Sequence, residues 1–297
     1  MKKFNSPVYP IPPSFNKNED LDLTSTIKYL TFLQKNNSKV IMTTAGTSQY
    51  NLMTKEEIRT FNLSIVNNFK GEKILGLPLL SLKHLLEEVI YLNTSIKDYK
   101  NNSLLILFPE RYYDDKQIID YFTEICSTSN FPVLVHGNIL KKGIGGSYEY
   151  SKPLLEKLQQ IPNFIGIKEE ASNIMHSTDN LPLGLEVIVA GGSMKRFWAL
   201  EPHGATTYLA GVGSFNPKLE ELFFKNYFNN KNKSRDIIEY VEKPLFNIFM
   251  ALGWHLSMRT ALKIMGFIDY DRNPFKQISK SNKILINQSL NILNSYE

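Results

Sequence analysis

The chain has 297 residues, of which 42% are apolar, and its formal net charge is +5. This length suits one large α/β domain or a barrel with an appendage, and the apolar content is sufficient for a large core. The lysines are spread along the sequence with carboxylates nearby, so the positive charge indicates a solvated surface and argues against nucleic-acid binding.

The cysteines, histidines and hydropathy of the sequence exclude several further kinds of protein. Cys126 is the single cysteine, which leaves no disulfide framework and no thiolate metal site. The five histidines show no H-x-H or H-x-x-x-H pairing, so no metal site is expected. No stretch approaches about 18 uninterrupted apolar residues, and no apolar region follows the two lysines of the N-terminus. We therefore expect no membrane span, no secretion and a cytoplasmic location.

Short apolar runs rich in β-branched residues recur at a regular pitch and predict strands. In chain order they are residues 8–12, 40–46, 73–79, 103–109, 132–137, 164–169, 186–192 and 206–212. Segments with helical periodicity lie between most of these runs. The clearest are residues 21–34, 55–69, 82–92 and 116–127.

Helix-start signals support this reading. Thr54 with Glu57 and Asp114 with Gln117 both have the spacing of a capping box. The asparagine–proline pair at 216–217 predicts an N-cap followed by proline in the first helical position. After this pair the strand signal stops, and four helical segments are expected to follow. They are residues 217–230, 233–252, about 255–266 and about 276–295.

Eight strands that alternate with helices within about 230 residues predict a (β/α)8 barrel. A doubly wound open sheet is the competing α/β fold, and the barrel is favoured because no strand is followed by a G-x-G-x-x-G turn. We predict a barrel domain over residues 1–230 and a C-terminal helical domain over 231–297.

Lys168 is the most informative single residue. It ends the apolar run at 164–167, where an ammonium is costly to bury. Desolvation disfavours the charged form of such a lysine, which makes it a candidate amine nucleophile for carbonyl substrates. The alternative is a lysine that extends its amine to solvent from the strand end.

Reacting groups of a barrel lie at the C-terminal ends of its strands. The candidate residues at these ends are, in chain order, Gly46, Thr47, Ser48, Tyr112, Tyr113, His136, Lys168 and Gly191. They offer an amine, an imidazole, phenols, hydroxyls and backbone amides, but no carboxylate pair and no metal-ligand set. This combination suits carbonyl chemistry through an imine better than hydrolysis.

The segment PNFIGIKEEASN at 162–173 is similar to the pattern P-N-[IV]-x-G-[IV]-K-[ED]-x-[ST]-G-[ND]. With FPVLVHGN, VIVAGG and the helical stretch 244–267, it makes the chain resemble the dihydrodipicolinate synthase/N-acetylneuraminate lyase family over nearly its whole length. The resemblance implies a pyruvate-dependent class I aldolase on a (β/α)8 barrel, with the imine on Lys168 and no cofactor.

The resemblance also assigns substrate-binding residues. Gly46, Thr47 and Ser48 correspond to the family's carboxylate-binding turn, although Gly46 replaces one of its two hydroxyls. The following helix would help to present amides to an anion. Lys141 stands where synthase members place an arginine for a second carboxylate, and Gly191 and Thr206 complete the predicted set.

The proton-transfer residues depart from the family more strongly. His136 replaces the relay tyrosine of the fifth strand; the alternative is a neutral, hydrogen-bonded structural histidine. Tyr112 or Tyr113 would enter the site of a neighbouring subunit, or both would simply cover the barrel rim.

We therefore predict a lyase that condenses or cleaves pyruvate or a related 2-keto acid through an imine on Lys168, with an aldehyde as a candidate second partner. Two alternatives stay open: a dehydratase that uses the same imine, and a silent keto-acid-binding protein. The expected assembly is a homo-oligomer built as a dimer of dimers.

Overall fold

A computed structural model describes residues 4–44, 46–77, 81–137, 140–142, 146–272 and 278–296. The chain forms two compact units. The first comprises residues 1–5 and 72–209, and the second comprises residues 6–71 and 210–297.

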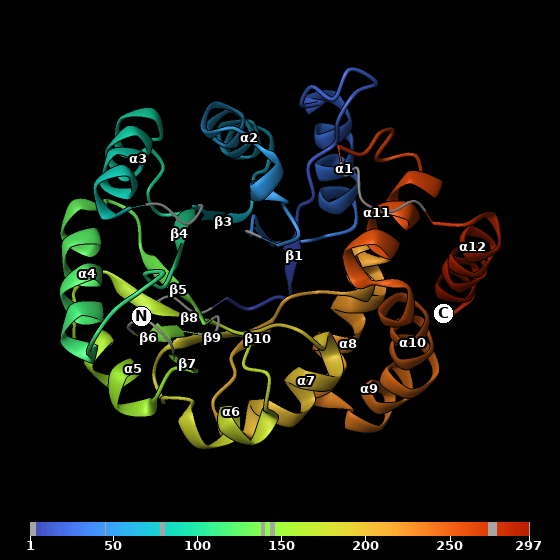
Figure 1. The fold of residues 1–297 in the computed structure, drawn as a ribbon. Helices are drawn as coiled ribbons and strands as arrows, with labels where there is room; N and C mark the ends of the chain where they lie inside the picture. Colours follow the sequence, from blue (N-terminus) through green and yellow to red (C-terminus); the bar gives the residue numbers. More distant parts are fainter. Residues whose placement is uncertain are drawn as a thin grey trace. The chain divides into compact units, whose positions relative to one another are not determined.

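Six parallel strands form the centre of the first unit, paired in chain order. They are β3 (Glu72–Gly76), β4 (Asn102–Leu107), β5 (Val133–Gly137), β8 (Phe164–Glu169), β9 (Glu186–Val189) and β10 (Thr207–Tyr208). The helices between them lie along the outer side of these strands (Figure 1). They are α3 (Leu82–Ser95), α4 (Asp115–Thr128), α5 (Lys152–Leu158), α6 (Ile174–Asn180) and α7 (Ser193–Leu200). Two further strands, β6 (Leu140–Lys142) and β7 (Gly146–Tyr148), form a separate antiparallel pair that the sequence analysis did not predict.

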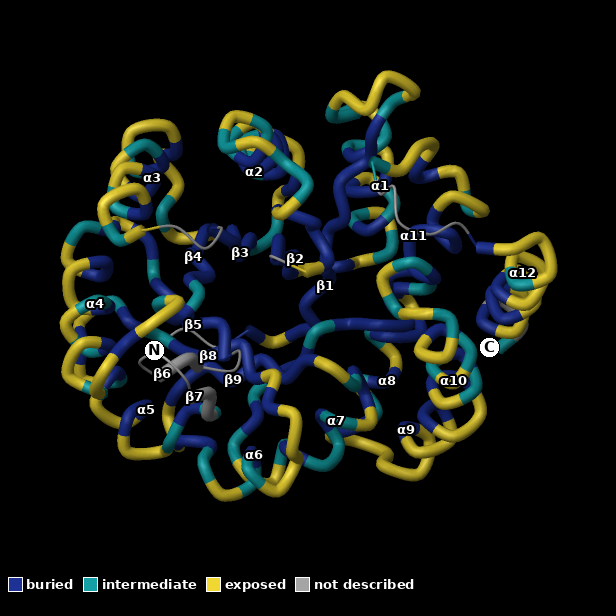
Figure 2. Tube along the Cα trace, in the orientation of Figure 1, coloured by how far each residue is buried: buried dark blue, intermediate teal, exposed yellow. Residues whose placement is uncertain are grey.

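Burial explains why these segments adopt these structures. All five residues of β5 are buried, as expected for a parallel strand covered on both faces. Helix α4 instead buries one stripe, formed by Ile118, Phe122, Ile125 and Cys126 at helical spacing. Figure 2 shows the contrast, with the parallel strands of this unit mostly dark blue and the helices divided between buried and exposed faces.

The second unit contains two parallel strands and the C-terminal helices. Strand β1 (Val8–Pro10) pairs with β2 (Val40–Met42), and each is followed by a helix, α1 (Leu23–Lys35) and α2 (Lys55–Asn68). The later helices are α8 (Pro217–Asn229), α9 (Lys231–Ile237), α10 (Lys243–Leu252), α11 (Trp254–Ile264) and α12 (Lys280–Ser295). In the part of the chain that the structure describes, no helix is long and apolar enough to cross a membrane.

Eight parallel strands therefore alternate with helices along the chain, and helices alone follow the last of them. This confirms the predicted (β/α)8 barrel class with C-terminal helices. Every predicted strand overlaps an observed one, and most observed strands are shorter because the end of the apolar run continues into a loop. The predicted domain boundary falls at Asn230, which caps both α8 and α9; that a domain boundary lies there stays a prediction.

The predicted helix starts are also observed, one of them in altered form. Thr54 and Glu57 form a complete capping box, with backbone-to-side-chain bonds of 3.2 and 2.8 Å. Asp114 accepts from the Gln117 amide at 2.9 Å, but the Gln117 side chain accepts from Tyr113, one residue before the N-cap. The second box is therefore displaced by one residue.

The buried stripe of α4 predicts a large loss of stability on truncation. Ile118→Ala should lower the free energy of unfolding by about 2–5 kcal/mol, because the removed atoms leave a cavity in a fully buried site. Ile90→Ala is the matched control on neighbouring α3, where the side chain is 53% exposed. Urea unfolding of both variants measures the difference, and equal losses would contradict this view of the core.

Candidate active site

Lys168 lies near the end of β8 and is 2% exposed, so it does not extend its amine to solvent. Gly166 allows β8 to approach β9 closely, since an added Cβ would lie 2.2 Å from the backbone oxygen of Glu186. In the register of the parallel pair β5–β8, Lys168 stands directly opposite His136. The structure thus brings together the two residues that the sequence places at neighbouring strand ends.

A third residue, Glu170, completes the cluster. Lys168 Nζ lies 2.7 Å from His136 Nε2 and 2.5 Å from Glu170 Oε2. The same carboxylate oxygen lies 2.6 Å from His136 Nε2. Three titratable groups therefore contact one another at a single point, which we call the Lys–His–Glu cluster.

The electrostatics of the cluster follow from burial and proximity. Burial lowers the pKa of Lys168, and the Glu170 carboxylate opposes that shift. Burial and the charge of Lys168 lower the pKa of His136 to about 4. Burial raises the pKa of Glu170, but the hydrogen bond from His136 and the charge of Lys168 outweigh it, and the net shift is downward. At neutral pH the cluster holds a carboxylate and a neutral imidazole.

Hydrogen-bond capacity limits how His136 participates. Its Nε2 has one bonding position, so it either accepts from the lysine or donates to Glu170, but not both. Its Nδ1 is buried and bonds to none of the described residues. The cluster is therefore able to exist in two proton arrangements that differ by the position of one hydrogen.

Glu169 points to the opposite face of β8, because side chains alternate along a strand. Its fully buried carboxylate accepts from Arg196 of α7 at two points, Nε at 3.1 Å and Nη2 at 2.9 Å. It also accepts from Ala171 N and the Ser177 hydroxyl at 2.8 and 2.7 Å. This network fixes the loop that carries Glu170.

Gly191, predicted to bind substrate, lies beside the cluster. An added Cβ there would approach Glu170 Cγ at 3.9 Å, and the backbone has a φ of +74° that favours glycine. Thr206 lies elsewhere, just before β10, where its hydroxyl bonds to the backbone of Val187 and to Glu186. Its substrate-binding role stays a prediction, as does that of Gly191.

The two tyrosines of the β4–α4 loop differ sharply in their exposure to solvent. Tyr112 is 2% exposed and Tyr113 is 69% exposed, so only Tyr113 presents its ring to the surroundings of this chain. Lys141 lies in β6, but its side chain is outside the described residues, as is Ala45 in the predicted carboxylate-binding turn.

The predicted turn at 46–48 belongs to the second unit and is bonded mainly to itself. The amides of Thr47 and Ser48 donate to Thr44, and the Ser48 hydroxyl donates to the Ile11 carbonyl at 2.7 Å. Among the described residues, the Thr47 hydroxyl makes no comparable bond. The prediction of carboxylate binding therefore rests mainly on Thr47 and less on Ser48.

Basic side chains gather beside this turn. A cavity of about 230 Å³ is lined by Gln49 and by three basic residues of α11, His255, Arg259 and Lys263. An added Cβ at Gly46 would lie 3.5 Å from the His255 ring. The sequence analysis missed these residues, although their spacing of four places them on one helix face. Asp271 also lines the cavity and pairs with Arg259, so the positive charge of this helix face is partly neutralised.

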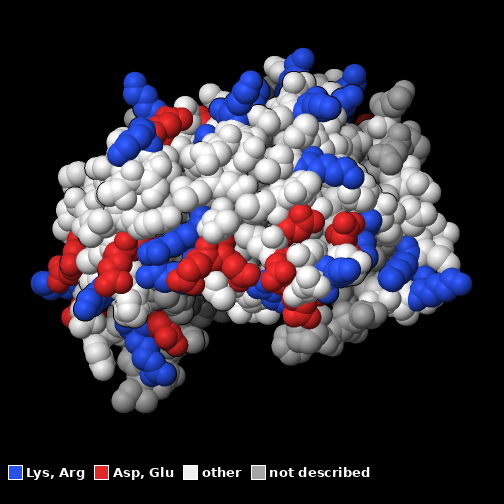
Figure 3. Space-filling model, turned by 90° about the horizontal axis from the view of Figure 1, so that it is seen from above, with Lys and Arg blue, Asp and Glu red and all other residues white. Residues whose placement is uncertain are grey.

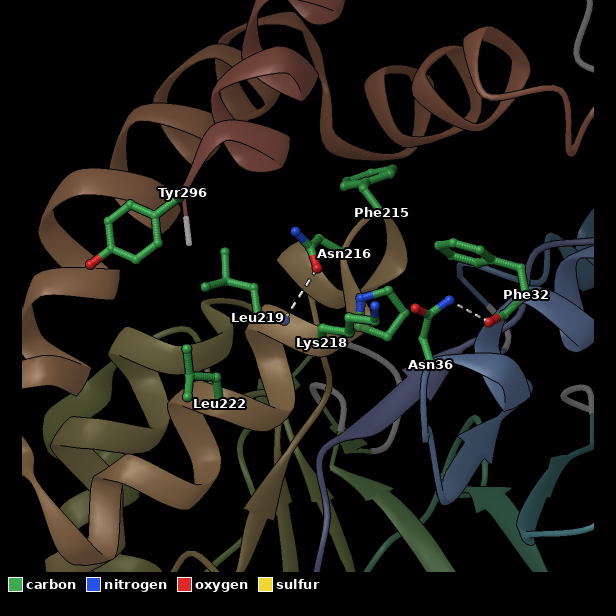
Figure 4. A pocket seen from close by; sticks show the side chains of 9 residues that line it. Phe32, Asn36, Phe215, Asn216, Lys218, Leu219, Leu222 and Tyr296 are labelled. Carbon is green, nitrogen blue, oxygen red and sulfur yellow. Dashed lines mark hydrogen bonds between the residues drawn. The ribbon is translucent and has the colours of Figure 1, made fainter.

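A larger cavity of about 400 Å³ lies between α1 and the start of α8 (Figure 4). Two of its polar side chains are already bonded: the Asn36 amide donates to Phe32 O, and Asn216 accepts from Leu219 N. None of the site residues predicted from the sequence lines this cavity, so it is not the active-site candidate. In the described residues, no group of three or more His, Cys, Asp or Glu side chains is arranged to hold a metal ion.

Comparison with known proteins decides the family. The model of the dihydrodipicolinate synthetase family matches residues 4–293. The chain belongs to this family. Its members are typically lyases of the class I aldolase type. A curated relative, the 4-hydroxy-tetrahydrodipicolinate synthase of Brachyspira hyodysenteriae (strain ATCC 49526 / WA1), is 23% identical over 209 residues, which is 68% of each chain.

Solved structures support the fold. Dihydrodipicolinate synthase from Aquifex aeolicus is similar with a TM-score of 0.82, 16% identity and 98% coverage of both chains. CdNal from Clostridium difficile, in complex with mannosamine, has a TM-score of 0.79, 14% identity and full coverage of both chains. At these identities the likeness establishes the barrel fold alone. Basic and acidic side chains occur together on the face drawn in Figure 3.

The pKa of His136 gives a direct test of the cluster. Its imidazole should titrate near pH 4 in the folded protein and near 6.5 in urea. Stability from the neutral ring is therefore complete above about pH 6.5 and is lost as the pH falls toward 4. NMR titration of the imidazole measures the shift, and a folded-state midpoint at or above 6.5 would contradict the arrangement.

The Glu169–Arg196 pair predicts a non-additive stability effect. Arg196→Met should lower the free energy of unfolding by about 3–5 kcal/mol, because it leaves a buried carboxylate without its cation. Adding Glu169→Gln should restore part of that loss, since the charge is then removed as well. Thermal or urea unfolding of the single and double variants checks this, and simple additivity would disprove the coupling.

Proposed function

We propose that the protein is an imine-forming lyase that acts on pyruvate or a related 2-keto acid through Lys168. The observation that carries the proposal is a buried amine in direct contact with an imidazole and a carboxylate. Burial favours the neutral, nucleophilic form of the amine, and the two neighbours are within reach to exchange protons with it.

The chemistry follows from this arrangement. The amine of Lys168 adds to the keto carbon, and water leaves to give a protonated imine. The positive imine nitrogen then accepts electron density, so that a carbon–carbon bond next to it forms or breaks through an enamine. His136 supports proton transfer in this scheme, because a neutral imidazole lies at hydrogen-bond distance from the reacting nitrogen.

A carboxylate-bearing substrate is proposed from the family resemblance, which assigns its binding to the turn at 46–48. Within the second unit, Arg259 and Lys263 of α11 line a cavity that Gln49 borders, and Asp271 lines it as well. The relatives that are named as dihydrodipicolinate synthases also favour a keto-acid substrate. With Lys141 in place of an arginine, we expect a second substrate with a different or more weakly held anionic group.

Two other functions each have one favourable observation. A dehydratase would use the same imine, and the carboxylate of Glu170 beside Lys168 suits the removal of a proton and water. A silent keto-acid-binding protein is favoured by the ion pair itself, because contact with Glu170 stabilises the unreactive ammonium form. Covalent trapping separates the silent protein from both enzymes.

Assembly and location are proposals of the same kind. The exposed Tyr113 is the phenol available to a neighbouring subunit, which favours a dimer of dimers. A similar solved structure is described as a monomeric dihydrodipicolinate synthase variant, with a TM-score of 0.81 and 18% identity, so the fold alone does not impose this assembly. We place the protein in the cytoplasm because its only cysteine is a buried free thiol.

Borohydride trapping tests the proposed function. Incubation with a panel of 2-keto acids, followed by reduction and peptide mass analysis, should add the mass of the reduced adduct to Lys168. Lys168→Ala should abolish the adduct, because it removes the nucleophile, whereas Lys157→Ala on the exposed face of α5 should leave it unchanged. An unmodified 163–173 peptide across the whole panel would remove both enzyme readings.

A further inference from the structure

Glu170 occupies a distinctive place in the Lys–His–Glu cluster. It follows Lys168 by two residues, so both side chains emerge on the same face at the end of β8. Its side chain is 39% exposed, whereas those of Lys168 and His136 are 3% and 5% exposed. Glu170 is therefore the member of the cluster that lies between the buried amine and solvent.

We propose that Glu170 is the catalytic residue that carries protons between Lys168 and the carbonyl oxygen of the substrate during imine formation. This role rests on the proposed function and identifies the residue that transfers protons in its imine-forming step. The single oxygen Oε2 is 2.5 Å from the amine, so transfer between the two needs no intervening atom.

The hydrogen balance of the reaction shows what this residue must do. An ammonium with three hydrogens and a carbonyl become a protonated imine with one hydrogen and a water molecule. Two hydrogens therefore pass from nitrogen to oxygen. Glu170 is able to take each from the nitrogen and deliver it to the oxygen, and it is a carboxylate again after each delivery.

Transfer of the first hydrogen converts the ammonium into a nucleophilic amine. Glu170 takes a proton from the ammonium, and the nitrogen lone pair then forms the bond to the keto carbon while the carbonyl π pair moves to oxygen. That oxygen then takes this proton from the carboxylic acid of Glu170 and becomes a hydroxyl. The second hydrogen releases water: Glu170 takes a proton from the attached nitrogen and gives it to the hydroxyl. The C–O bond then breaks, and the nitrogen lone pair forms the imine bond.

His136 is less suited to this task, although it touches the same atoms. Its side chain is more deeply buried than that of Glu170, and its only bonded nitrogen has one position for a hydrogen. In imine formation it supports the transfer by orienting the carboxylate through its contact at 2.6 Å. Gly191 leaves room beside Glu170, and the Glu169–Arg196 network holds the loop in place.

Removing Glu170 would have a different effect on imine formation if the residue only formed a structural ion pair with Lys168. If Glu170 only stabilised the ammonium, its removal would release more neutral amine, and both acylation and imine formation at Lys168 would become faster. If Glu170 carries protons, its removal still releases the amine for acylation but slows imine formation. The two rates together distinguish these roles.

The experiment compares wild type, Glu170→Gln, Glu170→Ala and a control, Glu156→Gln, on the exposed side of α5. Rapid mixing with pyruvate and timed borohydride quench gives the rate of imine formation. Brief labelling with acetic anhydride gives the acylation rate of Lys168. We expect Glu170→Gln to form the imine about 10²–10⁴-fold more slowly, with acylation at least as fast as in wild type. Formate should restore part of the rate in Glu170→Ala, and Glu156→Gln should match wild type in both measurements.

Three outcomes overturn the proposal. Imine formation in Glu170→Gln at the wild-type rate or faster assigns the protons to another group. A parallel fall in both rates means that Glu170 maintains the structure of the site. If the wild-type protein forms no imine with any 2-keto acid, the proposed function itself is wrong. This failure is separate from a failure of the role of Glu170, because the variants are compared only if the wild-type protein forms a trapped imine.

Discussion

The contact between the Lys168 amine and the Glu170 carboxylate is the interaction on which the candidate site depends. An ammonium at the end of a buried strand is unstable unless a negative charge lies close by. The residue just beyond the strand supplies that charge, because side chains alternate from face to face, so that Glu170 follows Lys168 on one side and Glu169 points to the other. Two adjacent glutamates thus do different work: one meets the amine, and the other anchors the loop through Arg196.

The three residues of the Lys–His–Glu cluster also differ in burial. His136 and Lys168 come from neighbouring strands in direct register, so their positions are fixed by the sheet. Glu170 is the first residue beyond the strand and is the most exposed of the three. A rigid, buried pair is thereby combined with a carboxylate whose position depends on a loop. Such a division suits a site in which one group must stay fixed while another exchanges protons with a changing partner.

Much of this was predictable from the sequence, because strands and helix starts are local features. The apolar runs gave all eight parallel strands, and their ends gave the Lys168–His136 neighbours. Glu170 was within reach of the same reasoning, because it follows Lys168 by two residues, but the strand-end pattern did not single it out. Arg196 was not within reach, because its partner depends on how α7 packs against the strand. The basic face of α11 had a detectable spacing, whereas its proximity to the turn at 46–48 came only from the three-dimensional structure.

The division of the chain into two units has a consequence for synthesis. The first unit is complete in sequence once residue 209 has been made, so the Lys–His–Glu cluster is able to form while the chain is still growing. The second unit joins residues 6–71 to residues 210–297, and its N-terminal part must wait for the last helices. The first two βα units therefore gain their remaining partners within the second unit only near the end of synthesis.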